Sequence, residues 1–412
     1  MTIAGSREPL VRILAEEAAE QGGHAQATLV GSGGRVSTRQ AALVNGAAGH
    51  ALDYDDVQLT LGGHPSVPVF PALLALAEWR GDPGSDLLTA FVAGFETECR
   101  IGATVMPGHY GVGFHTTATV GTFGAAAACA HLLRLDATAW RHALGIAGTE
   151  AAGLKSMFGT MCKPLHAGRA AEAGLLAASL AARGFTSNTD ALECPQGFAA
   201  THTDTYRPER ALADPTAFQI RSVLFKFHAA CFGTHAGIEA ALRLRERHSI
   251  APERVRAVRL RVPPGHLAMC NIQEPRTGLE GKFSLRFTTA LALAGRDTSD
   301  AAFTDAAVHE REVVALRDRV TVEPEQGLSS GCTRVALELD DGSTYEELVD
   351  MEQPESDLDR QHRRLETKFR ALAGPVVGAE RADELSRAAR GAAAAPSMAA
   401  VAALTAPPVA TR

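Results

Sequence analysis

Hydrophobic residues recur with helical spacing over most of the first 250 positions of this chain. The spacing predicts alanine-rich and glycine-rich helices at 9–21, 39–51, 68–79, 85–106, 120–133, 137–152, 167–182 and 234–248. Small residues dominate several helix faces, as in GTFGAAAACA at 121–130, and such faces let helix backbones approach closely. A hairpin at 28–37 is the one early strand signal. The pattern therefore predicts a packed helical domain.

The pattern changes after residue 248. VRAVRLRV at 255–262 alternates apolar residues with arginine, which is the period of a half-buried strand. Further strands are predicted at 320–323, 333–339 and 344–349, the last two joined by a turn at Asp341-Gly342. Helical spacing returns at 358–373, and the final APPVATR is expected to fray. We therefore expect a mainly α protein with a separate α+β region at about 250–357, inserted before the C-terminal helices.

Composition restricts the class of protein. The chain has 412 residues, of which 46% are hydrophobic, so it can bury a substantial core. A formal net charge of −7 gives no basic field, so we expect no nucleic acid partner and no membrane partner. No apolar stretch approaches the roughly 18 residues of a spanning helix, and the N-terminus lacks the pattern of a leader peptide. We expect a cytoplasmic protein whose seven scattered cysteines form no structural disulfides.

Lysine is rare in this chain. Of forty basic residues, the lysines are Lys155, Lys163, Lys226, Lys282 and Lys368. Because arginine fills almost every other cationic position, a lysine can mark a place that needs the compact charge of an ammonium group. Random placement is the alternative explanation for any single lysine. Two of them stand beside histidines at the starts of predicted helices, in MCKPLHAGR and FKFHAACFGTHA.

Two loops carry further candidate chemistry. HALDYDDVQLTLGGHPS places Asp53, Asp55 and Asp56 after a helix, and its glycine pair lets the chain reverse so that His64 can face a cleft. The alternative is that these are solvated loop charges and that His64 caps the next helix.

The second loop, PGHYGVGFHTTATVG, carries His109 and His115 before Thr116 and Thr117 at a helix start. Free N–H groups and hydroxyls at that start can bind an anion, and a histidine there can act as general acid or base. Ordinary threonine capping is the alternative. The glycines do not form a dinucleotide motif, and the histidine and aspartate spacings match no compact metal-ligand pattern. We therefore expect no dinucleotide cofactor and no compact metal site, the alternative being a metal site assembled from distant residues.

Five motifs together resemble one family. In chain order they are NGAAGHALDYDD…HPS, GFHTTATVGTFGAAAA, KPLHAGRAAEAG, FKFHAACFGTHAGIEAA and KFSLRFTTALAL. Each is weak alone, but the ordered set resembles the MmgE/PrpD family of 2-methylcitrate dehydratases and cis-aconitate decarboxylases. The resemblance implies a homodimer in which a helical domain and a smaller α+β lid enclose a cleft for small polycarboxylates, without metal or organic cofactor. With the hinge near Lys226, the helical domain would comprise residues 1–226 and 358–412, and the lid residues 227–357.

The resemblance also implies roles for individual residues. The expected catalytic residues are His64, His115, Lys163 and Lys226, and the expected substrate-binding residues are Asp53, His166 and Cys231. The two lysines would stabilise the aci-carboxylate that forms when a proton leaves the carbon next to a carboxylate. His115 would be the base and His64 the acid, or the reverse. Asp53 would orient an imidazole.

The chain departs from the decarboxylase branch of this family. That branch has a lid tyrosine where this chain has Phe287, and a histidine where it has Cys231. The segment VQLTLGG also lacks the polar residues of that branch, and relatives begin with further helices, so we expect a late translation start or a missing part of the helical core. We therefore predict a cofactor-independent hydro-lyase that dehydrates a 2-methylcitrate-like hydroxy acid. The alternatives are an epimerase or isomerase of a dicarboxylate such as iminodisuccinate, and a catalytically silent family member.

Overall fold

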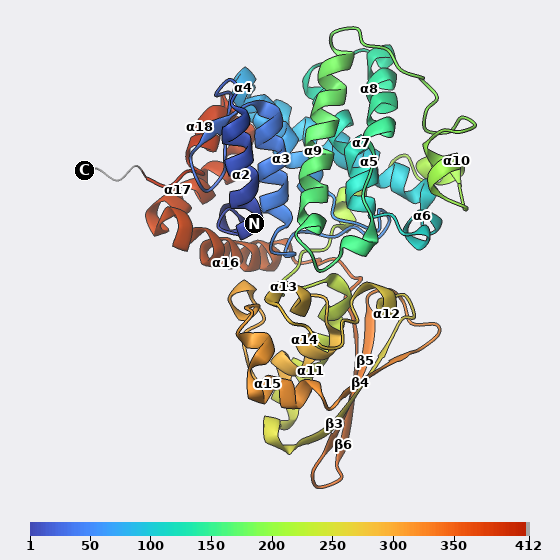
Figure 1. Ribbon diagram of the computed structural model, residues 1–412, viewed down its shortest axis with the longest axis vertical. Coiled ribbons are helices and arrows are strands. Elements are labelled where there is room, and N and C mark those ends of the chain that lie inside the picture. Colours follow the sequence, from blue (N-terminus) through green and yellow to red (C-terminus); the bar gives the residue numbers. More distant parts are fainter. Residues whose placement is uncertain (409–412) are drawn as a thin grey trace.

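The computed structural model describes residues 1–408, and the last four residues of the segment expected to fray lie outside the described residues. Figure 1 shows two bodies, one above the other. The upper one, which we call the helical body, contains α1 (Thr2–Gly5), α2 (Pro9–Gln21), β1 (Ala27–Thr28), β2 (Arg35–Val36), α3 (Thr38–His50), α4 (Ser66–Arg80), α5 (Gly84–Val105), α6 (Gly108–Val112), α7 (Thr116–Leu132), α8 (Ala137–Glu150), α9 (Cys162–Ala181), α10 (Phe198–His202), α16 (Leu358–Val377), α17 (Ala379–Arg390) and α18 (Met398–Ala403).

The lower one, which we call the smaller body, surrounds a second hydrophobic core. Its elements are α11 (Phe232–His248), β3 (Val255–Val262), α12 (His266–Met269), α13 (Gly278–Gly281), α14 (Leu285–Leu293), α15 (Arg311–Arg317), β4 (Val320–Pro324), β5 (Cys332–Leu339) and β6 (Thr344–Asp350). The sheet order is β4-β3-β5-β6, with β3 and β4 parallel and the other pairs antiparallel. Helix α11 packs on β5 and β6, and α14 packs on β4.

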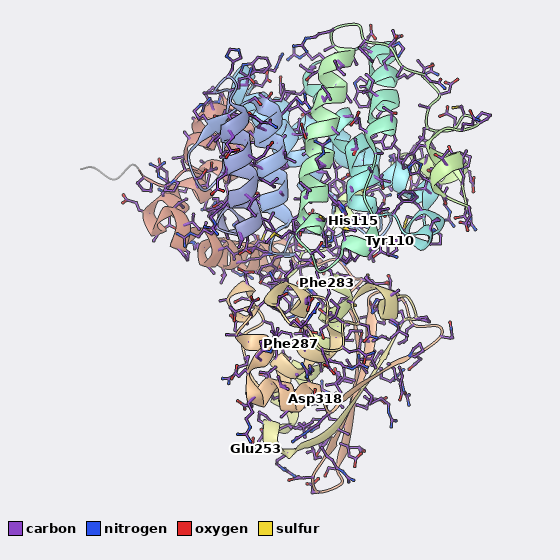
Figure 2. All side chains as sticks on the ribbon, viewed as in Figure 1. Tyr110, His115, Glu253, Phe283, Phe287 and Asp318 are labelled. Carbon is purple, nitrogen blue, oxygen red and sulfur yellow. The ribbon has the colours of Figure 1, made fainter. Side chains whose placement is uncertain are left out.

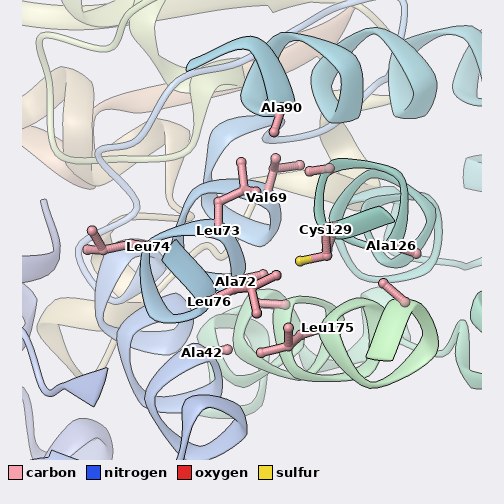
Figure 3. Close-up of a cluster of buried hydrophobic side chains, with 14 of the residues drawn as sticks. Ala42, Val69, Ala72, Leu73, Leu74, Leu76, Ala90, Ala126, Cys129 and Leu175 are labelled. Carbon is pink, nitrogen blue, oxygen red and sulfur yellow. The ribbon is translucent and has the colours of Figure 1, made fainter. Parts of the chain in front are cut away.

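The helical body is organised around α7. All of its residues from Thr116 to Ala130 are buried between α4, α5, α8 and α9, and Figure 3 shows side chains of this core, including Leu73, Cys129 and Leu175. Close approach requires glycine, because a Cβ on Gly94 of α5 would lie 2.6 Å from the Gly124 carbonyl oxygen of α7. The small residues of the sequence therefore permit tight helix packing, as predicted.

The sheet shows the predicted alternation of buried and exposed residues. Every second residue of β5 is buried, and the arginines of β3 reach the outer face, where Arg256 pairs with Glu338 at 3.1 Å. The inner face is apolar and contacts α11 and α14. Because the side-chain period of a strand is two, one face joins the core and the other carries exposed ion pairs.

The predicted mainly α architecture is confirmed, and each predicted helix and strand is present. Helices α7 and α9 begin four and five residues earlier than predicted, at Thr116 and Cys162. The sequence analysis missed α17 and the shorter helices α1, α6, α10, α12 to α15 and α18. Helix α16 contacts α1, so the chain returns to the helical body after β6. Within residues 1–408 no helix combines the length and the apolar character needed to cross a bilayer. The domain boundaries at 226/227 and 357/358 stay predictions.

A buried carboxyl group stands out in the helical core. Glu98 of α5 is fully buried, and a Cβ on Gly124 would lie 2.6 Å from its Oε2 atom. Neither carboxyl oxygen has a hydrogen-bond partner among the described residues. Burial raises the pKa of Glu98 well above its usual value, and the nearby Asp56 carboxylate adds to this effect. Glu98 therefore keeps its proton in the folded protein, whereas an unfolded chain releases it above about pH 4.5.

Substituting Glu98→Gln should stabilise the protein increasingly as the pH rises. The raised pKa means that the unfolded state gains stability by releasing this proton, and glutamine has no proton to release. We expect the difference in free energy of unfolding between variant and wild type to grow by about 1–3 kcal/mol between about pH 4 and about pH 8. Urea denaturation across this range measures it. Glu16→Gln, on the exposed face of α2, is the matched control, and an equal effect of both substitutions would contradict the prediction.

Candidate active site

Four of the five lysines bind one short segment after α3, residues Leu52–Tyr54. The backbone carbonyl oxygens of this segment accept hydrogen bonds from Lys282 at 2.7 Å, from Lys226 at 2.9 Å and from Lys368 at 2.6 Å. The fourth lysine, Lys163, pairs with the Asp53 carboxylate at 3.1 Å. This convergence supports the interpretation that lysine marks positions that need an ammonium group.

Asp53 lies at the centre of these contacts. Its backbone has a φ of 49°, a left-handed conformation that aspartate tolerates better than most residues. Its Oδ1 atom is 2.7 Å from the Nζ atom of Lys226 and 3.1 Å from that of Lys163. Burial alone would raise the pKa of Asp53, but the charges of the two lysines outweigh burial and hold that pKa well below its usual value. Asp53 is therefore an ionised, buried counter-ion.

His50, at the end of α3, links this pair to a second carboxylate. Its Nε2 atom is 3.0 Å from the Nζ atom of Lys163, and its Nδ1 atom is 2.9 Å from Asp55. An ammonium group only donates, so Nε2 accepts and Nδ1 donates to Asp55. The sequence analysis missed His50 and its contact with Asp55, whereas Asp53, which was expected to orient an imidazole, lies 3.9 Å from the Nε2 atom of His64. The feature that could have identified His50 is its position three residues before the first aspartate of the acidic triplet.

His64 is fixed in one tautomer. Its Nδ1 atom is 2.9 Å from the backbone carbonyl oxygen of Asp56 and 3.4 Å from the Asp55 carboxylate. Both partners accept, so the neutral ring carries its hydrogen on Nδ1 and its lone pair on Nε2, which lies 3.9 Å from the Asp53 carboxylate. Burial lowers the pKa of His64 well below its usual value, although the charge of Asp55 opposes this shift. His64 is therefore a neutral imidazole with Nε2 available as a base.

The predicted glycine turn positions His64. Gly62 has a φ of 66°, and a Cβ there would lie 2.4 Å from the Met106 side chain. A Cβ on Gly63 would lie 3.1 Å from the backbone nitrogen of Thr117, and the His64 N–H donates to the Thr117 hydroxyl at 3.0 Å. Thr116 and Thr117 are fully buried, so Thr117 anchors the loop that carries His64.

His115 precedes α7 and pairs with His166 of α9. Their Nδ1 atoms are 3.0 Å apart, so one ring donates and the other accepts. Burial lowers the pKa of His115 well below its usual value, and the charge of Lys163 lowers it further. Burial also lowers the pKa of His166 to about 4. The rings of His64 and His115 both lie against His50, with centroid distances of 4.6 Å and 6.0 Å.

A cavity of about 480 Å³ separates these groups from the smaller body. In Figure 2, Tyr110 and His115 lie at the lower end of the helical body, and Phe283 lies at the facing end of the smaller body. The predicted site residues that line the cavity are His64, His115, Lys163 and Cys231. Lys163 also lies 5.1 Å from the centre of the Phe283 ring. The cavity thus combines a cation and two neutral imidazoles with apolar walls, and its volume suits a small ligand.

Three of the expected site residues are not among the residues that line this cavity. Asp53 and Lys226 were expected to line it, but within residues 1–408 the lining residues do not include them; they form a buried ion pair beside Lys163. His166 lies behind His115 and does not line the cavity either. Phe287, the position of the expected lid tyrosine, is buried in the smaller body against Phe303.

Four residues of the site could hold a metal ion. One ligand atom from each of His50, Asp53, Asp55 and His64 can be chosen so that all lie within 4.8 Å of one another. Lys163 and Lys226 already place two positive charges on Asp53, and Lys163 occupies the Nε2 lone pair of His50. A divalent cation would have to displace or repel these ammonium groups. The donor set therefore fits a charge-balanced cluster better than a metal centre.

Two domain models of one protein family match most of this chain. Residues 1–211 match the model of the MmgE/PrpD N-terminal domain, and residues 228–391 match the model of the MmgE/PrpD C-terminal domain. Three similar proteins are cis-aconitate decarboxylases. The proteins from Homo sapiens and Mus musculus are each 31% identical, over 85% and 83% of this chain and 76% and 73% of their own lengths. The protein from Aspergillus terreus is 28% identical, over 87% of this chain and 79% of its own length.

Substituting Asp53→Asn should destabilise the protein strongly. The change leaves two buried ammonium groups facing each other without a counter-ion, and breaking a buried pair in this way costs about 3–5 kcal/mol. Guanidinium denaturation at neutral pH measures the loss. Asp86→Asn, which removes an exposed pair with Arg134, is the matched control and should cost about 0–1 kcal/mol. If both substitutions have the same small effect, the Asp53 cluster does not hold the fold together.

Proposed function

Because this chain belongs to the MmgE/PrpD family, we propose that it is a lyase that acts on a small polycarboxylate. More closely, we propose that it dehydrates a hydroxy-tricarboxylate such as 2-methylcitrate. The observation that carries this proposal is the cavity in which Lys163, His64 and His115 meet. The names of the similar proteins support lyase chemistry on a tricarboxylate.

Lys163 is proposed to bind the carboxylate next to the carbon that loses its proton. Two of its three N–H bonds point to Asp53 and His50, which leaves one for a ligand. Proton loss places a second negative charge on that carboxylate as an aci-carboxylate, so a fixed ammonium group stabilises the transition state more than the substrate. Lys226 is proposed to act indirectly, since it shares Asp53 with Lys163 and so fixes its position.

His64 is proposed to be the base, which is the second of the two assignments that the sequence left open. Its Nδ1–H is held by the Asp56 carbonyl oxygen, so the Nε2 lone pair is free to take the C–H proton. The electrons of that bond then form the new carbon–carbon double bond. Asp55 lies 3.4 Å from Nδ1 and stabilises the positive charge that His64 acquires.

His115 is proposed to be the acid. When His166 donates to its Nδ1 atom, the neutral His115 ring carries its hydrogen on Nε2 and can give it to the departing hydroxyl group. The carbon–oxygen bond breaks, water leaves, and His115 regains a proton as His64 loses one. Two neutral imidazoles of opposite tautomer thus supply the base and the acid of a dehydration.

Decarboxylation of cis-aconitate is the second candidate, because the similar proteins carry that name. It would use Lys163 in the same way, but no hydroxyl group would leave. Cys231 stands in the cavity wall where the resemblance places an imidazole in the decarboxylase branch, and a thiol is a weak proton donor. This difference favours dehydration.

Epimerisation of a dicarboxylate such as iminodisuccinate is the third candidate, since it begins with the same proton abstraction. Assembly as a homodimer and a cytoplasmic location stay predictions.

Proton NMR in deuterated water, with a chelator present, tests these functions on 2-methylcitrate, citrate, cis-aconitate and iminodisuccinate. Dehydration should convert a hydroxy acid into an alkene, with a new vinyl signal or ultraviolet absorbance. Decarboxylation would release carbon dioxide from cis-aconitate, and epimerisation would exchange a C–H proton without forming an alkene. A ligand that raises the melting temperature without any turnover would indicate a catalytically silent protein.

Lys163→Ala should lower the rate of this reaction by about 10²–10³ or more. Arg169→Ala, which removes an exposed cation of the same helix, is the matched control and should leave the rate unchanged. Circular dichroism confirms that both variants are folded. If Lys163→Ala retains full activity, Lys163 does not stabilise the aci-carboxylate.

The pH dependence of kcat/KM should have an acid limb below about pH 6.5. The folded pKa values of His64 and His115 are lowered from 6.5, so both rings stay neutral at pH 7 and acquire protons only in more acidic solution. The base form is then lost as the pH falls through these lowered values. Initial rates between about pH 5 and pH 8 measure the limb, and a midpoint above 6.5 would contradict the assignment of His64 as the base.

A further inference from the structure

One phenol in the cavity wall has no part in the mechanism described above. Tyr110 of α6 lines the same cavity as His64, His115 and Lys163. Figure 2 shows Tyr110 and His115 at the end of the helical body that faces Phe283 of the smaller body. Tyr110 belongs to the glycine-rich loop whose two histidines the sequence marked as candidates, but its hydroxyl group was not considered there.

The hydroxyl group of Tyr110 is free to bind a ligand. Within residues 1–408 it has no hydrogen-bond partner, and its oxygen, unlike the enclosed Nδ1 atom of His266, keeps accessible surface. Burial raises the pKa of Tyr110 above its usual value, and the nearby Cys231 and Asp53 groups raise it further. The phenol therefore keeps its proton at pH 7 and acts as a neutral hydrogen-bond donor. Because Cys231 also lines the cavity, these neighbours place the hydroxyl group on the cavity side.

Lys155 holds the ring of Tyr110 in place. Its Nζ atom lies 3.7 Å from the centre of the ring, a cation–π contact, and donates to the Tyr110 carbonyl oxygen at 2.9 Å. The backbone N–H of Lys155 donates to the carbonyl oxygen of Gly113 at 2.9 Å, just beyond the end of α6. The short helix is thus tied to the segment that carries Lys155, so the direction of the phenol is set by the fold.

Several other donors of the cavity wall are already used within the protein. The Nδ1–H group of His64 is held by the Asp56 carbonyl oxygen at 2.9 Å. The Nε2 atom of His266 is 2.9 Å from the Ser330 carbonyl oxygen, and the Ser330 hydroxyl donates to Glu352 at 2.6 Å. These groups cannot bind an anionic ligand without breaking a bond that the fold supplies.

We propose that the Tyr110 hydroxyl group donates a hydrogen bond to a second carboxylate of the substrate, apart from the carboxylate that Lys163 binds. This inference rests on the proposed function, because it takes a polycarboxylate as the ligand of the cavity. Lys163 has one N–H bond left for a ligand, so a second carboxylate between apolar walls needs a donor of its own. A bond from a neutral phenol to a carboxylate is charge-assisted and therefore strong.

The contact should act on binding more than on the chemical step. The carboxylate next to the reacting carbon gains charge as the proton leaves, whereas the second carboxylate keeps the same charge throughout. Tyr110 therefore stabilises the bound substrate and the transition state by similar amounts. Removing its hydroxyl group should raise KM and leave kcat nearly unchanged, which distinguishes Tyr110 from Lys163.

The test measures the affinity for propane-1,2,3-tricarboxylate, a probe that has three carboxylates and no leaving group. Isothermal titration calorimetry should show that Tyr110→Phe binds it about 10-fold to 100-fold more weakly than the wild-type protein. The substitution removes one hydroxyl group and keeps the ring beside Lys155. Tyr206→Phe, which removes a hydroxyl group outside the cavity wall, is the matched control and should bind as the wild type does.

Fluorine NMR reports whether the contact is direct. The chain has four tyrosines, so protein labelled with 3-fluorotyrosine gives four signals, and the Tyr110 signal is the one that Tyr110→Phe lacks. This signal should shift when the tricarboxylate is added, whereas the Tyr206 and Tyr345 signals should stay in place because neither residue lines the cavity.

The outcomes separate this inference from the proposed function. If Tyr110→Phe binds the probe as tightly as the wild-type protein, Tyr110 does not hold a carboxylate while the polycarboxylate site stands. If the affinity falls but the Tyr110 signal does not respond to the probe, its role is structural and the inference is wrong. If the probe does not bind the wild-type protein, the polycarboxylate site itself is wrong, and the inference falls with it.

Discussion

The structure depends on a single buried negative charge and on the two ammonium groups that compensate it. A carboxylate in the position of Asp53 is tolerable only when cations meet it at close range. Lys163 comes from α9 of the helical body, and Lys226 comes from the chain just before α11 of the smaller body. The same charge balance therefore joins the two bodies and places Lys163 at the wall of the cavity between them.

The histidines of the site contact the same buried ion pair, directly or through Asp55. Lys163 fixes the tautomer of His50, and His50 holds Asp55, which also faces His64. The ion pair thus positions His50 and Asp55, whereas the glycine turn and Thr117 position His64. Burial then keeps the imidazoles neutral, which a base requires and which would be hard to achieve in open solvent.

The sequence analysis identified those site residues whose neighbours in the chain are distinctive. Lys163 was found because it is a rare lysine before a helix, and His64 because a glycine pair precedes it. Whether a residue faces the cavity or lies behind it could not be predicted, since that depends on which helix passes in front. Asp53 and Lys226, which were expected to line the cavity, form an ion pair beside Lys163 instead.

Because four of the five lysines gather around residues 52–54, the protein has few lysine amines on its surface. Lys163, Lys226 and Lys282 are buried and Lys368 is held by two backbone carbonyl oxygens, so Lys155 is the lysine that remains apart from them. Reagents that acylate amines would find few side chains to modify. A dye or a solid support directed at lysine would consequently find Lys155 as the one lysine outside this cluster, and its ammonium group already donates to the Tyr110 carbonyl oxygen of α6.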